Sequence, residues 1–211
     1  LLTDLTDVLA PVKDQFHPAK VNETFIAKTG KNVGWPGDIS VSAYYYRTDL
    51  FAEMGYGEVD WETLNWTDFL SMVKDIAGKG KYAFCFPASG WSALFEFAIH
   101  MLGGTTVSQD GQKITAGDEL GIRAMTMVKE LWDTKAGLDV GWWSAPYWAA
   151  IQDGTLIGDF AAAWTRGFIE AQVKSPEQGL GLWRFAKFPT GDGIKYRTGI
   201  WGGAQLVNPK C

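Results

Sequence analysis

The chain has 211 residues, of which 46% are hydrophobic and 20% are charged, and its net charge is −5. Such a composition is typical of a soluble globular protein with enough apolar material for one large domain or two small ones. The acidic balance and the lack of a basic run argue against nucleic acid as a partner, and no apolar segment approaches the ~20 residues that cross a bilayer.

The ends of the chain indicate a piece of a longer protein. It begins at Leu1 without an initiator Met and stops at Cys211 directly after Lys210. The missing signal peptide therefore says nothing about the compartment. Cys85 and Cys211 lack the spacing of a metal or redox motif, and Cys85, within the apolar stretch KYAFCFP, is expected to be a buried structural thiol.

Three segments have the pattern of helices. In residues 65–80, Asn65 can cap the helix, with Asp68 three residues later, and the apolar stripe consists of Phe69, Val73 and Ile76. Residues 92–104 form a second, strongly apolar helix that a glycine pair ends. A third runs within residues 115–137, with a stripe at helical spacing made of Leu120, Ala124, Met127, Val128 and Leu131.

Strand patterns alternate with these helices. They are ISVSAYYYR (39–47), KYAFCF (81–86), LIGDFAAAW (156–164) and LWRFAKFP (182–189). Strands separated by helices indicate βα crossovers, so we expect an α/β fold with a largely parallel sheet covered on both faces.

Aromatic residues are the main compositional signal, with 11 Trp, 7 Tyr and 12 Phe. In GDFAAAWTRG, Trp164 stands after three alanines and two residues before Arg166. Small neighbours would leave the indole face open to a flat ligand at the carboxyl end of a strand, where open α/β sheets bind ligands. Core packing is the alternative for this tryptophan. Trp91 and Trp201 also stand near element ends beside small residues.

Enzymatic interpretations have less support. His17 and His100 form no metal motif, and the chain has no nucleophile elbow, Walker loop or dinucleotide loop. A glycosidase would need two carboxylates facing one sugar bond, and Asp38, Glu96 and Asp159 could be nominated only because acidic residues are abundant. We expect no catalytic residue, no metal and no cofactor.

The order of motifs resembles the extracellular solute-binding proteins of carbohydrate ABC transporters, the group that includes maltose-binding protein. Arg47 departs from that pattern, in which Asn usually follows the tyrosine. The matching segments are TGKNVGWPGDISVSAYYYRTDLFAEMGY (29–56), LNWTDFLSMVKDIAGKGKYAF (64–84), WAAIQDGTLIGDFAAAW (148–164), LGLWRFAKFP (180–189) and GGAQLVNP (202–209).

This resemblance implies a two-lobe, periplasmic-binding-protein-like (type II) fold that closes around its ligand by hinge motion. Residues 1–38 would belong to the first lobe, 39–198 would form the second, and 199–211 would return to the first. The family's amino-terminal strands and carboxyl-terminal helices would be missing, which leaves the cleft at best half built.

The resemblance also implies a function and a site. The protein would be a monomeric, periplasmic or cell-surface receptor that delivers a sugar or oligosaccharide to a membrane permease, with any lipoprotein anchor in a missing amino-terminal segment. A polyamine ligand and a glycoside-acting enzyme are the alternatives. Trp164, Trp91 and Trp201 would stack on sugar rings, Asp38 and Arg166 would hydrogen-bond sugar hydroxyls, and Ser40 and Trp148 would also bind the ligand. Trp142, Trp143, Tyr147 and Trp148 would extend the cleft or pack as a loop.

Overall fold

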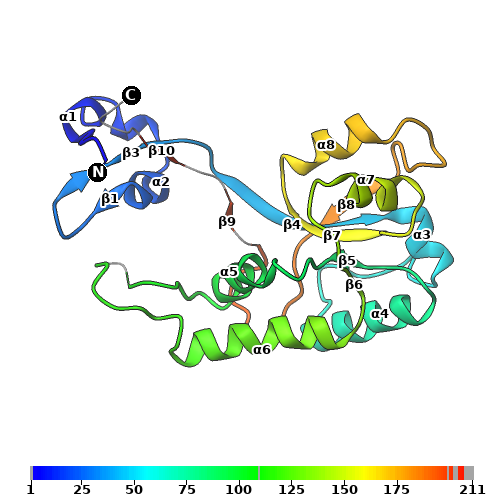
Figure 1. Ribbon diagram of the computed structural model, residues 1–211. Helices are drawn as coiled ribbons and strands as arrows, with labels where there is room; N and C mark the ends of the chain where they lie inside the picture. The colour runs from blue at the N-terminus through cyan, green and yellow to red at the C-terminus, as the bar shows by residue number, and fades with distance from the viewer. Residues whose placement is uncertain (1, 109, 199, 202–203, 207–211) are drawn as a thin grey trace.

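The computed structural model describes residues 2–108, 110–198, 200–201 and 204–206. These residues form a smaller body and a larger α/β body (Figure 1). The extended strands β4 (Ser40–Arg47) and β9 (Ile200–Trp201) lie on the two connections between them (Figure 1). The predicted α/β fold class is confirmed.

The smaller body combines the first part of the chain with the segment that returns near its end. Strand β3 (Gly34–Pro36) pairs antiparallel with β10 (Ala204–Leu206), so these distant segments lie side by side. The other elements of this body are short, namely α1 (Thr6–Leu9), the 3-10 helix η1 (Lys13–Gln15), α2 (Pro18–Glu23), β1 (Phe25–Ile26) and β2 (Lys31–Asn32).

The larger body is built around β4, the central strand of its sheet. β4 is antiparallel to β7 (Gly158–Ala162) on one side and to β8 (Trp183–Ala186) on the other, and its first residues pair with β9. β5 (Phe84–Cys85) and β6 (Gly137–Leu138) pair in parallel, and a parallel bridge joins Tyr82 to Leu156, just before β7. The strands β5, β6, β7, β8 and β9 therefore share one direction, and β4 runs against them.

The expectation of a largely parallel sheet is thus wrong for the central strand. The crossover rule fixes the direction of a strand that follows a helix packed on the same sheet. β4 instead arrives from the smaller body, directly after β3, with no such helix before it. Its direction is set by where the chain enters the larger body.

Helices cover both faces of this sheet (Figure 1). On one face lie α4 (Trp66–Gly78), α5 (Trp91–Met101) and α6 (Glu119–Asp133), which correspond to the three predicted helices. The Asn65 side chain caps α4 by accepting a hydrogen bond from the Asp68 backbone N–H. The other face carries α7 (Ala145–Gln152) and α8 (Thr165–Gln172), and α3 (Thr48–Glu53) follows β4 directly.

Strand alternation divides the core between the two faces, because successive side chains of β4 point in opposite directions. Tyr44 packs with Phe69 and Phe160 in the core beneath α4, α5 and α6, whereas Tyr45 packs with Tyr147 in the core beneath α7 and α8. Cys85 is buried, as predicted. In the stripe expected on α6, Leu120 is 39% exposed and does not belong to the core, while Ala124, Met127, Val128 and Leu131 are buried.

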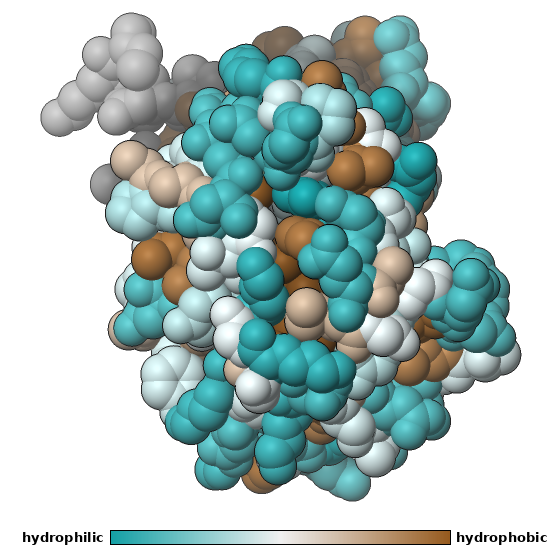
Figure 2. Space-filling view, turned by 90° about the vertical axis from the view of Figure 1, so that its right-hand side faces the viewer, coloured by the Kyte–Doolittle hydropathy of each residue, from teal (hydrophilic) through white to brown (hydrophobic). Residues whose placement is uncertain are grey.

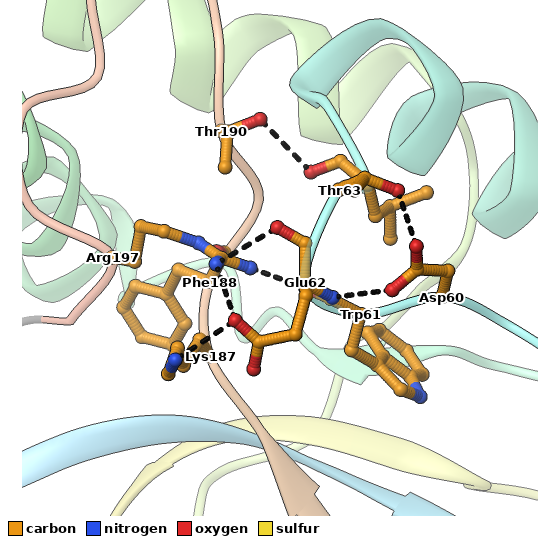
Figure 3. A network of polar contacts seen from close by, with 9 residues as sticks. Asp60, Trp61, Glu62, Thr63, Lys187, Phe188, Thr190 and Arg197 are labelled. Carbon is orange, nitrogen blue, oxygen red and sulfur yellow. Dashed lines mark hydrogen bonds and ion pairs between the residues drawn. The ribbon is translucent and has the colours of Figure 1, made fainter.

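A polar network fastens the segment after β8 to the loop before α4 (Figure 3). The Arg197 guanidinium donates to the backbone oxygens of Phe188 (2.8 Å), Glu62 (3.1 Å) and Trp61. The Glu62 carboxylate pairs with both Lys187 and Arg197.

The side of the larger body that faces away from the smaller one is mostly hydrophilic, with hydrophobic residues in small patches (Figure 2).

Candidate functional site

A group of partly exposed aromatic side chains lies on the larger body, and we call it the aromatic patch. The Trp164 ring centroid is 5.1 Å from that of Trp143 and 5.6 Å from that of Phe168. Trp143 also contacts Trp148 at 5.7 Å and Tyr147 at 5.5 Å. Trp143 and Trp164 are each 37% exposed and Phe168 is 52% exposed, so the patch offers accessible ring surface to a ligand.

Two local structures bring these rings together. Trp164 occupies the amino-terminal cap position of α8, directly after β7, and Phe168 lies one turn further along the same helix. Trp143 lies in the loop after β6, and Tyr147 and Trp148 lie on α7, which begins where the Ser144 side chain accepts a hydrogen bond from the Tyr147 N–H at 3.3 Å.

The patch lies at the end of the sheet where β4 enters from the smaller body. Ala162, two residues before Trp164, is paired with Ser42 near the start of β4. β4 also pairs there with β9, and the Thr198 hydroxyl donates to the Ser42 carbonyl oxygen at 2.6 Å. A ligand on the patch would therefore lie beside the connections between the two bodies.

The alanines before Trp164 do not all keep its face free. Ala161 and Ala162 are buried within β7, at 4% and 1% exposure, and only Ala163 is exposed. The Tyr45 hydroxyl donates to the carbonyl oxygens of Ala162 and Ala163. Of the three alanines, Ala163 is therefore the one whose side chain can leave the indole face open, and the role expected for the run stays a prediction.

Trp91 belongs to a different aromatic group. It is the first residue of α5 and contacts Phe86 at 5.2 Å and Trp132 at 5.5 Å between ring centroids. Trp142 lies between this group and the aromatic patch. Its ring packs against Gly90, the residue before Trp91, so closely that a Cβ added there would come within 2.8 Å of it. Trp142 also packs against the cores on both faces of the sheet. The stacking role of Trp91 stays a prediction.

The remaining predicted residues are dispersed. Arg166 points away from the patch and pairs with Glu170 at 2.8 Å, beside a cavity of about 390 Å³ between α8 and β8 that Tyr45 and Trp183 also line. Asp38 is exposed just before β4, and Ser40 is buried with its backbone paired to Trp201. The Trp201 side chain lies outside the described residues.

A buried carboxyl group lies beneath the patch. Asp159, on β7, accepts hydrogen bonds from the backbone N–H groups of Cys85 (3.0 Å) and Phe160 (2.9 Å) through Oδ1, and from the Tyr147 hydroxyl (2.9 Å) through Oδ2. Burial raises the pKa of Asp159 to about 7, against the effect of these bonds and of a further one from the Trp142 side chain.

The three acidic residues nominated for glycoside hydrolysis do not form a pair. Asp159 is 3% exposed with both oxygens hydrogen-bonded, whereas Asp38, just before β4, and Glu96, on α5, are exposed. Among the residues that the structure describes, no group of three or more His, Cys, Asp or Glu side chains could hold a metal ion. Within the same residues, no helix combines the length and the apolar character needed to span a membrane.

Sequence reasoning found part of the patch and missed the rest. Trp164 and Trp148 were expected to bind ligand, and the structure brings them into one group through Trp143. Phe168 was not singled out, although its position four residues after Trp164 places both rings on one helix face. No sequence pattern indicates that Asp159 lies beneath these rings.

Comparison with known proteins identifies the family. A sequence model described as "Bacterial extracellular solute-binding protein" matches residues 1–210. The lactose-binding protein of Rhizobium radiobacter is 24% identical over 174 residues, which cover 81% of this chain and 39% of that protein.

Solved structures agree in fold. One is the galacto-N-biose-/lacto-N-biose I-binding protein of an ABC transporter from Bifidobacterium longum, with a TM-score of 0.75 at 24% identity over 98% of this chain and 50% of that one. Another is an ABC transporter-associated binding protein from B. animalis subsp. lactis Bl-04 in complex with β-1,6-galactobiose, with a TM-score of 0.74 at 26% identity over 99% and 52%. The chain thus spans about half the length of these structures. It belongs to the bacterial extracellular solute-binding protein family.

Proposed function

We propose that the protein is a non-catalytic receptor of an ABC importer, located outside the cytoplasmic membrane, that binds a sugar or oligosaccharide and delivers it to a membrane permease. The observation that carries this proposal is the aromatic patch at the end of the sheet where β4 enters the larger body. Indole faces cover the apolar C–H faces of sugar rings, and Trp143 and Trp164 together offer such a surface.

The ligands of similar proteins support a sugar. Lactose, lacto-N-biose and β-1,6-galactobiose are the compounds named for three of them. All three are saccharides, so we propose a sugar or an oligosaccharide as the ligand of this chain. Because the chain belongs to a family of solute-binding proteins, we favour a receptor over an enzyme.

The two-body architecture supports closure around the ligand. We propose that residues 1–38 and 199–211 belong to one lobe and residues 39–198 to the other, as in the hinge mechanism of binding proteins. The antiparallel pairing of β3 with β10 supports this division, because one of these strands comes from each of the two segments. Trp164 and Trp143 would contact the ligand from the larger lobe.

The carboxyl group beneath the patch does not favour the alternatives. A polyamine needs exposed counter-charges, and a glycosidase needs a carboxyl group within reach of the glycosidic oxygen. Asp159 is buried and bonded to backbone and side-chain donors, so it offers neither.

Tryptophan fluorescence tests the proposal directly. The protein is titrated with lactose, lacto-N-biose, β-1,6-galactobiose, maltose and spermidine. We expect a saturable spectral shift with at least one disaccharide, and we expect Trp164→Ala to weaken that affinity at least about tenfold, or about 1.4 kcal/mol.

Trp61→Ala is the matched control, because it also removes one indole but from the opposite face of the sheet, where Trp61 packs on Tyr44 and Tyr46. It should leave the affinity unchanged. Trp91→Ala in the same titration decides whether the second aromatic group takes part. A response to spermidine but to no sugar, or release of monosaccharides on incubation, would contradict the proposal.

A further inference from the structure

Asp159 connects three separate segments of the larger body through one carboxyl group. Its Oδ1 is held by the N–H groups of Cys85 on β5 and of Phe160 on β7, at 3.0 and 2.9 Å. Its Oδ2 accepts from the Tyr147 hydroxyl on α7 at 2.9 Å, and the Trp142 side chain also donates to this carboxyl group. The sheet thus holds one oxygen of the carboxyl group, and Tyr147, four residues after Trp143, is hydrogen-bonded to the other.

Tyr147 links Asp159 to the aromatic patch. Its side chain is completely buried, and its ring centroid lies 5.5 Å from that of Trp143 and 4.9 Å from that of Trp148. Tyr147 therefore forms the underside on which both indoles rest. A shift of the Tyr147 ring would move the surface that a ligand contacts.

The backbone of Trp143 shows why such anchoring is needed. Its φ angle is +66°, in the left-handed region that is unfavourable for a residue with a side chain. Such a conformation persists only where the surroundings fix it. Trp142, on one side of Trp143, packs against Gly90 and donates to Asp159, and Tyr147 on the other side donates to the same carboxyl group.

We propose that Asp159 is a positioning residue for ligand binding: by holding Trp142 and Tyr147, it keeps Trp143 in its left-handed conformation with the indole beside Trp164. Asp159 itself is buried and does not touch the ligand. This inference rests on the proposed sugar-binding function, since it assigns the ligand surface to the Trp143–Trp164 pair.

Two conservative variants test the inference. Tyr147→Phe removes only the hydroxyl group, and Asp159→Asn replaces the Oδ2 acceptor while retaining the side-chain shape. Tyr44→Phe is the matched control, because it also removes a fully buried hydroxyl, one that donates to the Ala83 carbonyl oxygen at 2.7 Å, but on the face of the sheet away from the patch.

Affinity for lactose, lacto-N-biose and β-1,6-galactobiose is measured far below the unfolding temperature, so that lost stability alone leaves the affinity unchanged. We expect Tyr147→Phe and Asp159→Asn each to weaken binding about five- to tenfold through lost preorganisation. In the double variant, the loss of affinity should be smaller than the product of the two single losses, because both substitutions remove the same hydrogen bond between Tyr147 and Asp159. Tyr44→Phe should lower the unfolding temperature and leave the affinity at the wild-type value.

Near-ultraviolet circular dichroism of the ligand-free protein supplies a second measurement. The contact between Trp143 and Trp164 should give a tryptophan signal that both test variants reduce and the control retains. If the test variants lose stability only, with affinity and dichroism unchanged, the inference is wrong although the sugar-binding function stands. If no sugar binds the wild type, the proposed function is wrong, and the role assigned to Asp159 in ligand binding is wrong with it, whatever the dichroism shows.

Discussion

Asp159 carries a carboxyl group that is buried within the sheet of the larger body. Tyr147 from α7 and Cys85 from β5 lie on the same face of the sheet as Asp159, and Tyr44 from β4 lies on the opposite face. Burial raises the pKa of all three, and the charge of Asp159 adds to this effect. None of them supplies a positive charge. Hydrogen bonds alone stabilise the Asp159 carboxylate, and burial outweighs them.

This environment makes the stability of the fold depend on pH in an uncommon direction. The pKa of Asp159 is about 7 in the folded protein, against 3.8 as its ordinary value. Between these values the unfolded chain loses a proton that the folded protein keeps, so stability falls as pH rises from about 4 to about 7 and then levels off. The full effect is on the order of 4 kcal/mol, since each pH unit corresponds to about 1.4 kcal/mol.

Urea unfolding at pH 5 and pH 8 measures this effect. The wild type should be less stable at pH 8, and Asp159→Asn should largely remove the difference. Carboxyl groups with lowered pKa values, such as that of Asp49 beside Arg47, act in the opposite direction, but only below about pH 4. Equal pH dependence in the variant and the wild type would show that Asp159 titrates normally.

At the scale of secondary-structure elements, local signals decided what the sequence could predict. The helix α4 was predictable because the Asn65 cap and the buried stripe of Phe69, Val73 and Ile76 all lie within the helix or next to it. α7 and α8 were missed because each has only eight residues and its ends hold aromatic residues that also fit a loop. Ser144 followed by Pro146 was the available signal for the start of α7.

The cap of α7 is expected to matter for both stability and binding. Ser144→Ala removes the acceptor of the Tyr147 N–H, which should cost about 1 kcal/mol of unfolding free energy. Because α7 starts directly after Trp143, the variant should also weaken sugar affinity. Asn65→Ala, which removes the cap of α4 on the opposite face, is the control: it should cost similar stability without changing affinity, as chemical unfolding and fluorescence titration would show. Equal sugar affinities in the two variants would show that the Ser144 cap does not affect ligand binding by the aromatic patch.

At the scale of the whole molecule, the architecture could be predicted from the order of motifs, but the arrangement of the sheet could not. The direction of β4 depends on the smaller body, and its neighbours come from residues 158–162 and 183–186. No local pattern encodes these distant pairings. For the same reason, sequence reasoning placed Arg166 beside Trp164, whereas α8 turns it toward Glu170. The assignment of the ligand-binding residues stays a prediction until titration tests it.

The Arg197 network fastens the segment after β8 to the loop before α4, so its loss should destabilise the larger body. Arg197→Met leaves three backbone oxygens without their donor and should lower the unfolding free energy by about 2 kcal/mol. Lys187→Met is the control, because it removes only a mostly exposed ion pair with Glu62 and should cost less than about 1 kcal/mol. Thermal unfolding distinguishes the two, and equal losses would contradict a central role for Arg197.

The position of β4 also has a consequence for how the chain is made. This strand leaves the ribosome well before its partners β7, β8 and β9, which all lie more than a hundred residues later. Until those segments have left the ribosome, three consecutive tyrosines, Tyr44 to Tyr46, have no sheet to enter and remain open to wrong pairings. The sheet of the larger body is therefore completed only after residues 158–201 have been made.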